Sequence, residues 1–340
     1  MPYQPVEDIP NMEKLRVDFR KLNPLMYEIL TNLGIALNHR HNFKKTPKDE
    51  SELLNFLKHQ LIIYGSTHNS IHTLIKHAIR QRYLPAVADA ASLVREQIEK
   101  VFIIALVLSD PHHWIKQALR GSFRTDYEDY LLQLDEHSNN PRYQEFLLNE
   151  YPKYFEKLQR FPRSRGRKET IISDYSRRVL EYNWENPRGR NPPWFKPIPR
   201  VKVRNVREYI KYYFEFPTPG KAATLITNKE IRKFLFRWHK DYSYICQYSH
   251  VAMGKSLLPV LNRIKHRDVA IQTKDIARNL MERIIIMSFT STASSCTFIV
   301  SKLRDSYGAK PLLKEFWAEL DAFALLSRAY WNMYPKKILS

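Results

Sequence analysis

The spacing of apolar residues between Pro85 and Asp110 is the feature that most constrains the fold of this chain. Apolar side chains recur there at steps of three and four residues, which places them on one face of a helix. They are Val87, Ala91, Val94, Ile98, Val101, Ala105 and Leu108. Pro85 suits the first turn of a helix, and Asp110-Pro111 ends the run. The pattern predicts a long amphipathic helix with a buried stripe.

The same periodicity recurs along most of the chain and predicts an all-α, multi-helix bundle. Further helices are expected over residues 12–40, 50–80, 111–137, 141–160, 167–184, 228–253, 273–306 and 310–334. No convincing set of alternating strands appears. Residues 198–206 are expected to be extended, because Pro197 and Pro199 disfavour a helix there. Glycine is sparse, at 8 residues, which argues against a glycine-rich nucleotide loop.

A basic, Pro- and Gly-containing connection separates two helical halves. From Arg160 to Lys211 the chain has fifteen Lys or Arg against five Asp or Glu. Prolines and glycines cluster at ENPRGRNPPWFKPIPR, residues 185–200. We therefore expect a helical region at 1–160, a basic linker or loop region at 161–227 and a helical region at 228–340. The two helical regions are expected to share one continuous core, since 44% of the residues are hydrophobic.

The positive charge of the chain indicates a polyanionic partner. The formal net charge is +20, and a field of this size favours polyanions: nucleic acid, an acidic protein or an anionic membrane surface. Nucleic acid is the expected partner. Phosphate contacts and base stacking are assigned to the central connection, with RNA expected rather than DNA. The residues concerned are Arg163, Arg165, Arg167, Lys168, Arg188, Arg190, Trp194 and Lys196. The alternative is a solvated linker whose aromatic residues Trp194 and Phe195 dock on the helices.

Compartment and membrane predictions rest on two local features. Cys246 and Cys296 lie far apart in sequence and form no CxxC motif, which favours a reducing, cytoplasmic compartment. Residues 284–301 form an uncharged run of eighteen, and eight of these are Ser or Thr. Such a run is almost long enough to span a bilayer, but its hydroxyl content favours a buried central helix. No membrane association and no signal peptide are expected.

The predicted helix at 229–253 carries a polar stripe beside its apolar face. Arg232, His239, Cys246 and His250 align on this stripe at helical spacing. In one interpretation His250 makes a buried structural hydrogen bond between helices. In a second, Arg232 and His239 match the R-x(4–6)-H signature of HEPN-type ribonucleases. In that chemistry an imidazole transfers the proton of a 2′-hydroxyl, and a guanidinium stabilises the negative charge of the phosphorane. Metal binding is the third interpretation, although no acidic ligand accompanies the stripe. We expect no metal and no cofactor.

A second histidine cluster occurs at THNSIHTLIKH. His68 and His72 are four residues apart, as zinc ligands on one helical face can be. No Glu follows in the HExxH manner. We therefore expect an ordinary polar edge of a helix here.

Two motifs resemble those of a bacterial family. Arg95 and Glu99 form R-x-x-x-E on a mostly apolar helix, and Tyr242, Cys246 and His250 form a later element. Together they resemble an uncharacterised all-helical family (domain of unknown function 5677) over about residues 65–260. Its Y-x-x-L-S-x-x-x-H element has Ile245 and Cys246 here in place of Leu and Ser. The resemblance implies a helical fold in which Arg95, Glu99 and His250 converge, and it implies no established activity.

Three functions follow as hypotheses. The favoured one is a basic, helical, bacterial nucleic-acid-binding protein without established catalysis. The first alternative is a metal-independent HEPN-like ribonuclease, acting as a toxin or defence effector, in which Arg232 and His239 or Arg95 and His250 meet at one phosphate. The second alternative is an interaction scaffold. It would use the aromatic segment EFWAELDAFALLSRAYWNMY, residues 315–334, as a core element or as the interface of a homo-oligomer.

Overall fold

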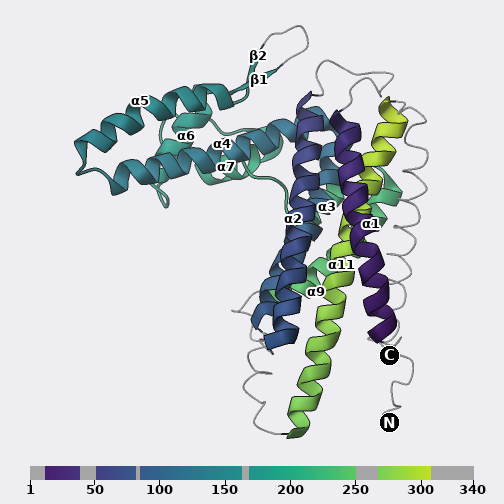
Figure 1. Ribbon diagram of the computed structural model, residues 1–340. Coiled ribbons are helices and arrows are strands. Elements are labelled where there is room, and N and C mark those ends of the chain that lie inside the picture. Colours follow the sequence, from purple (N-terminus) through teal and green to yellow (C-terminus); the bar gives the residue numbers. More distant parts are fainter. Residues whose placement is uncertain (1–11, 39–50, 82–84, 163–167, 250–266, 308–340) are drawn as a thin grey trace. The chain divides into compact units, whose positions relative to one another are not determined.

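The computed structural model describes residues 12–38, 51–81, 85–162, 168–249 and 267–307 (Figure 1). These residues are almost entirely helical, which confirms the predicted all-α fold. The chain divides into two compact units. The first combines residues 1–46, 54–109 and 219–340, and the second combines residues 47–53 and 110–218.

Within the described residues, the first unit is a bundle of five long helices and the short helix α8, built around α3. Its elements are α1 (Met12–Asn38), α2 (Ser51–Gln81), α3 (Pro85–Ser109), α8 (Pro219–Leu225), α9 (Lys229–Ser249) and α11 (Arg267–Tyr307). Helix α3 packs against α11 and α9, and α1 packs against α11 (Figure 1). The short helix α8 also packs against α3. All seven apolar residues of the predicted stripe on α3 are buried. The three- and four-residue spacing therefore identified one core-facing stripe of this helix. Its second half is buried on other faces too, since Phe102, Ile104, Leu106 and Val107 are also buried.

The uncharged run lies on α11. Leu280–Leu303 is long and apolar enough to cross a membrane, since an 18-residue window within it has a mean hydropathy of 1.5, but 72% of that window is buried inside the structure. Its hydroxyl groups bond within the helix, because Thr290 Oγ1 donates to the Ile286 carbonyl at 2.8 Å and Thr292 Oγ1 to the Ser288 carbonyl at 2.9 Å. Satisfied hydroxyls cost little to bury, which fits the interpretation of a buried central helix.

The second unit combines a helical hairpin with two short helices. Its elements are α4 (Pro111–Glu136), α5 (Pro141–Leu158), β1 (Arg160–Pro162), β2 (Lys168–Thr170), α6 (Asp174–Glu185), the 3₁₀ turn η3 (Pro199–Val201) and α7 (Val206–Tyr213). The strands pair antiparallel, with Arg160 opposite Thr170. The N-cap residues Asp110, Asn140, Ser173 and Asn205 each accept a backbone N–H through the side chain.

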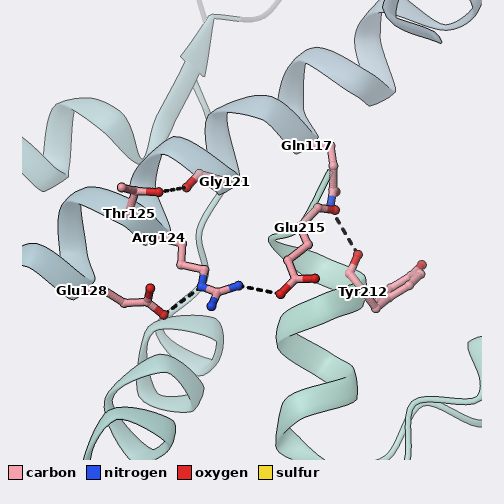
Figure 2. A network of polar contacts seen from close by, with 7 residues as sticks. All are labelled: Gln117, Gly121, Arg124, Thr125, Glu128, Tyr212 and Glu215. Atoms are coloured by element: carbon pink, nitrogen blue, oxygen red, sulfur yellow. Dashed lines mark hydrogen bonds and ion pairs between the residues drawn. The ribbon is translucent and has the colours of Figure 1, made fainter. Parts of the chain in front are cut away.

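Polar side chains of α4 hold α7 and the residues that follow it (Figure 2). The buried Gln117 side chain donates from Nε2 to the Tyr212 and Glu215 carbonyls, at 3.2 and 3.0 Å. Arg124 bridges Glu128 at 2.8 Å and Glu215 at 3.0 Å. A Cβ at Gly121 would lie only 3.0 Å from the Phe214 carbonyl oxygen, so the glycine permits this close approach. These contacts anchor α7 on a rigid helix.

Residues 168–225, within the region expected to be a basic linker or loop, contain β2, α6, η3, α7 and α8. The helix expected from residue 167 begins at Asp174, because Ser173 caps it and residues 168–170 pair as β2. Residues 198–206, expected to be extended, instead contain η3 and an isolated bridge between Ile198 and Val203. Helix α6 packs on both α4 and α7, so these helices belong to one unit. Along the chain, the two units therefore meet at residues 109 and 110 and at residues 218 and 219, whereas the three expected regions meet at residues 160 and 161 and at residues 227 and 228. The helix predicted at 310–334 lies outside the described residues.

Candidate functional site

Residues 186–207 form a basic segment in the second unit. The segment contains seven cationic residues and no Asp or Glu. The seven are Arg188, Arg190, Lys196, Arg200, Lys202, Arg204 and Arg207, and each is exposed. None of them forms an ion pair within the described ranges, whereas Arg177 of the neighbouring α6 pairs with Asp174 and Glu181. The charge of the basic segment is therefore available to an external anion.

Hydrogen bonds to backbone carbonyls hold the basic segment in one conformation. Tyr182 donates its hydroxyl to the Arg190 carbonyl at 2.6 Å. Asn191 bridges the segment, because its Nδ2 donates to the Arg204 carbonyl at 2.9 Å and its Oδ1 accepts the Val206 N–H at 3.2 Å. Arg207 donates from Nε to the Pro187 carbonyl at 2.9 Å, and its Nη2 donates to the same oxygen. The two ends of the segment are thus joined.

A tight turn presents two of the cations. Ile198 and Val203 form a bridge in which the Ile198 N–H donates to the Val203 carbonyl at 2.8 Å. Lys202 closes the turn with a φ of 56°, in the left-handed region that few side chains adopt. Arg200 and Lys202 are exposed on this turn.

A hollow with a volume of about 350 Å³ lies at the joined ends of the basic segment. Its lining contains three arginines, four asparagines and no carboxylate. The lining residues are Tyr182, Asn183, Asn186, Arg188, Gly189, Arg190, Asn191, Asn205, Val206 and Arg207. Guanidinium and amide groups are the side chains that donate several hydrogen bonds at once. This hollow therefore suits an anion with more than one acceptor oxygen.

The remaining residues predicted to contact nucleic acid have different surroundings. Lys168 lies exposed on β2, and Lys196 is exposed beside Trp194. The guanidinium of Arg178 lies over the Trp194 ring, 4.2 Å from its centroid, and the rings of Tyr175 and Tyr182 meet it edge to face. One face of Trp194 is therefore occupied, in part as the docked-aromatic alternative expects. Phe195 is buried. Arg163, Arg165 and Arg167 lie outside the described residues.

Arg232 and His239 both lie on α9, seven residues apart. Arg232 donates from Nε to the Ile226 carbonyl at 2.9 Å and from Nη2 to the Thr227 carbonyl at 3.4 Å. These bonds hold the chain that enters α9. The His239 ring packs beside Gly220, where a Cβ would lie 3.0 Å from Nε2. Both side chains thus have structural contacts that the R-x6-H spacing did not predict.

Arg95 and Glu99 meet α9 through Tyr242 and Cys246. Arg95 Nε lies 3.8 Å from Glu99 Oε1, and the Tyr242 hydroxyl donates to the same oxygen at 2.7 Å. Burial and this bond raise the pKa of Tyr242. Burial also raises the pKa of the Cys246 thiol, although hydrogen bonds from Tyr242 and Arg95 act in the opposite direction. The thiol is therefore neutral near pH 7, which argues against a thiolate nucleophile. His250, the fourth residue expected here, lies outside the described residues.

His68 does not lie on a polar helix edge, because its side chain is completely buried. Its Nε2 lies 2.8 Å from Asn23 Oδ1 and its Nδ1 lies 2.7 Å from Ser288 Oγ. Since Oδ1 only accepts, Nε2 carries the proton and Nδ1 accepts from the serine. Burial lowers the pKa of His68 to about 3 and that of His72 to about 4. Among the residues that the structure describes, no group of three or more His, Cys, Asp or Glu could hold a metal ion.

The fold and the basic segment define a helical protein with an exposed cationic segment that contains no carboxylate. Comparison of the chain with family models, curated proteins and solved structures gives no match. The resemblance of the R-x-x-x-E and Y-x-x-I-C-x-x-x-H motifs to an uncharacterised helical family stays a prediction.

Proposed function

We propose that this protein binds nucleic acid through the phosphates that contact the basic segment, residues 186–207. The observation that carries the proposal is the row of seven exposed cations with no carboxylate in the segment. When Lys and Arg that have no carboxylate partner neutralise phosphates, the counterions condensed on the nucleic acid are released, and this release drives binding. The segment is also held by hydrogen bonds to its own carbonyls, so little conformational entropy is lost on binding.

Single-stranded RNA is the expected ligand. A duplex major groove accepts an α-helix or a two-stranded ribbon, whereas the basic segment up to Asn205 contains only the turn η3. An irregular basic surface suits a flexible strand better, because single strands adapt to the positions of the charges. The ribonuclease alternative built on Arg232 and His239 is not proposed, since Arg232 donates from Nε and Nη2 to backbone carbonyls. The version built on Arg95 and His250 involves a residue outside the described ranges, and it is not proposed either.

Salt-dependent binding tests this proposal. Fluorescence anisotropy with single-stranded RNA, single-stranded DNA and duplex DNA is measured at increasing NaCl concentration. Each phosphate contact to a single strand contributes a slope of about −0.7 in log Kobs against log salt, so seven contacts give about −5. Replacing Arg200, Lys202 and Arg204 together with Gln should reduce the magnitude of the slope by about 2.

A triple Gln variant of Arg142, Lys153 and Lys157 is the matched control. These three cations are exposed on α5 in the same unit, so the net charge changes equally. The control should bind RNA with the slope of the unmodified protein. The proposal fails if RNA does not bind at low salt, if added salt has no effect, or if the two triple variants behave alike.

A further inference from the structure

The hollow at Arg188, Arg190 and Arg207 has a more specific chemistry than the rest of the basic segment. Arg188, Arg190 and Asn183 make no side-chain hydrogen bond or ion pair within the described part of the chain, so their donors are available to a ligand. Arg207 is already oriented by its bonds to the Pro187 carbonyl. The hollow therefore combines one guanidinium held in place with two that can close on an anion.

The backbone around the hollow brings these arginines together. Gly189 separates Arg188 from Arg190, and a Cβ at Gly189 would lie 2.9 Å from Asn186 Cβ and 3.2 Å from the Asn186 carbonyl oxygen. Only glycine fits this turn without displacing backbone. The Gly189 N–H donates to the Asn186 carbonyl at 2.9 Å, and the Tyr182 hydroxyl holds the Arg190 carbonyl. The two arginines are thus presented by a tight, bonded turn.

The chemistry of the lining selects the class of anion. A phosphodiester within a strand carries one negative charge, whereas a terminal phosphomonoester carries between 1.5 and 2 at about pH 7 and offers three acceptor oxygens. Three guanidinium groups without a carboxylate match the second group better. A volume of about 350 Å³ also lies at the small end of the range for ligand pockets, so the hollow has room for one nucleotide.

We infer that the hollow binds a terminal phosphomonoester together with the nucleotide that carries it. This inference rests on the proposed function, since it specifies which part of a nucleic acid the site recognises. Arg188 and Arg190 contact the phosphate oxygens, Arg207 completes the cationic wall, and the Asn183 amide bonds the attached nucleoside. The exposed cations Lys196, Arg200, Lys202 and Arg204 bind the rest of the strand.

The test compares RNAs of one sequence that differ only at their ends. One carries a 5′-phosphate, one a 3′-phosphate and one hydroxyl groups at both ends, and AMP alone is titrated by calorimetry. At physiological salt, a phosphate at the recognised end should tighten RNA binding by about tenfold or more. Binding of AMP with one molecule per chain identifies a free nucleotide as a second source of the same group.

Two double variants distinguish the contribution of the hollow to RNA binding from that of the other cations of the basic segment. The double variant Arg188→Gln with Arg190→Gln should abolish the preference for a phosphorylated end. The double variant Arg200→Gln with Lys202→Gln removes the same charge from the same segment. It should weaken all three RNAs equally and keep the preference. Asn183→Leu, which changes no charge, should weaken the preference without altering the salt slope.

The outcomes for the two proposals are distinct. Equal affinity for all three RNAs, with salt-dependent binding retained, overturns the inference about the hollow and leaves the proposed function standing. Loss of the end preference in both double variants also overturns the inference, because the preference would then follow total charge. Absence of RNA binding removes the proposed function, and in that case binding of AMP that Arg188→Gln abolishes would still support the hollow as a phosphomonoester site.

Discussion

Individual residues in this protein are explained by partners that are distant in sequence. His68 is the clearest case, because its two hydrogen-bond partners come from α1 and α11. Neither Asn23 nor Ser288 is signalled by the spacing of His68 and His72, which alone is typical of a helix edge or a zinc site. Tyr64 shows the same pattern, since its buried hydroxyl contacts Ser295 and the Gln97 carbonyl. The buried hydrogen bonds between helices of the bundle therefore could not be predicted from the sequence.

The buried histidines predict a loss of stability in acid. The folded-state pKa of His68, about 3, lies below the ordinary value of 6.5, so the unfolded chain binds protons first as the pH falls. Stability should therefore be lost below about pH 6.5, and for His68 this loss continues to about pH 3.

His68→Gln isolates this contribution. The variant should have a lower free energy of unfolding than the unmodified protein at pH 7.5. At about pH 5.5 this difference in unfolding free energy should be smaller by about 1.4 kcal/mol. Urea unfolding at pH 7.5, 6.5 and 5.5 measures the difference. If the difference in unfolding free energy does not change with pH, the pKa of His68 is not lowered by folding.

At the scale of elements, the long helices were predictable and the short ones were not. Periodic apolar residues over many turns identified α2, α3, α4, α5 and α11 to within a few residues, apart from the start of α11. Helices α7 and α8 contain eight and seven residues, too few to establish a period. Tertiary bonds such as those from Gln117 stabilise α7. The hollow could not be predicted from the sequence either. Arg207 lies on the short helix α7, and the position of α7 is what brings Arg207 near Arg188 and Arg190. The absence of acidic residues up to Glu208 was the available signal.

Gln117 should be the most sensitive contact between α4 and the end of α7. Gln117→Leu leaves the Tyr212 and Glu215 carbonyls without their donor, so the free energy of unfolding should fall by about 2 kcal/mol. Hydrogen exchange of the α7 amides should accelerate, and urea unfolding measures the total loss. Thr125→Ala is the control, because its hydroxyl bonds only the Gly121 carbonyl within α4 (Figure 2). Equal effects of the two substitutions would contradict this role for Gln117.

At the scale of the whole molecule, the basic segment and the most apolar helix are found in different units. The basic segment belongs to the second unit, while the apolar window of α11 belongs to the first. Composition alone predicted a polyanionic partner for the chain, but it did not distinguish which cations are paired. Contacts such as Lys116 with Glu169, at 2.7 Å, neutralise part of the charge outside the basic segment.

The buried position of α11 predicts that the protein does not insert into lipid. Because 72% of the 18-residue apolar window within Leu280–Leu303 is buried inside the structure, exposure of this window to a bilayer would require the bundle to open. In flotation with neutral phosphatidylcholine vesicles at high salt, the protein should remain in the aqueous fraction. High salt suppresses attraction between a basic surface and lipid headgroups, so flotation under these conditions would indicate insertion.

The lack of carboxylates in the basic segment also affects the unliganded protein. Seven like charges within 22 residues repel one another, so folding works against this repulsion in dilute buffer. Dissolved anions screen it, and salt should thus raise the melting temperature while it releases bound RNA. Salt thus stabilises the free protein and weakens its binding to RNA. Both effects arise because chloride reduces the same repulsion between cations that bound RNA would otherwise reduce.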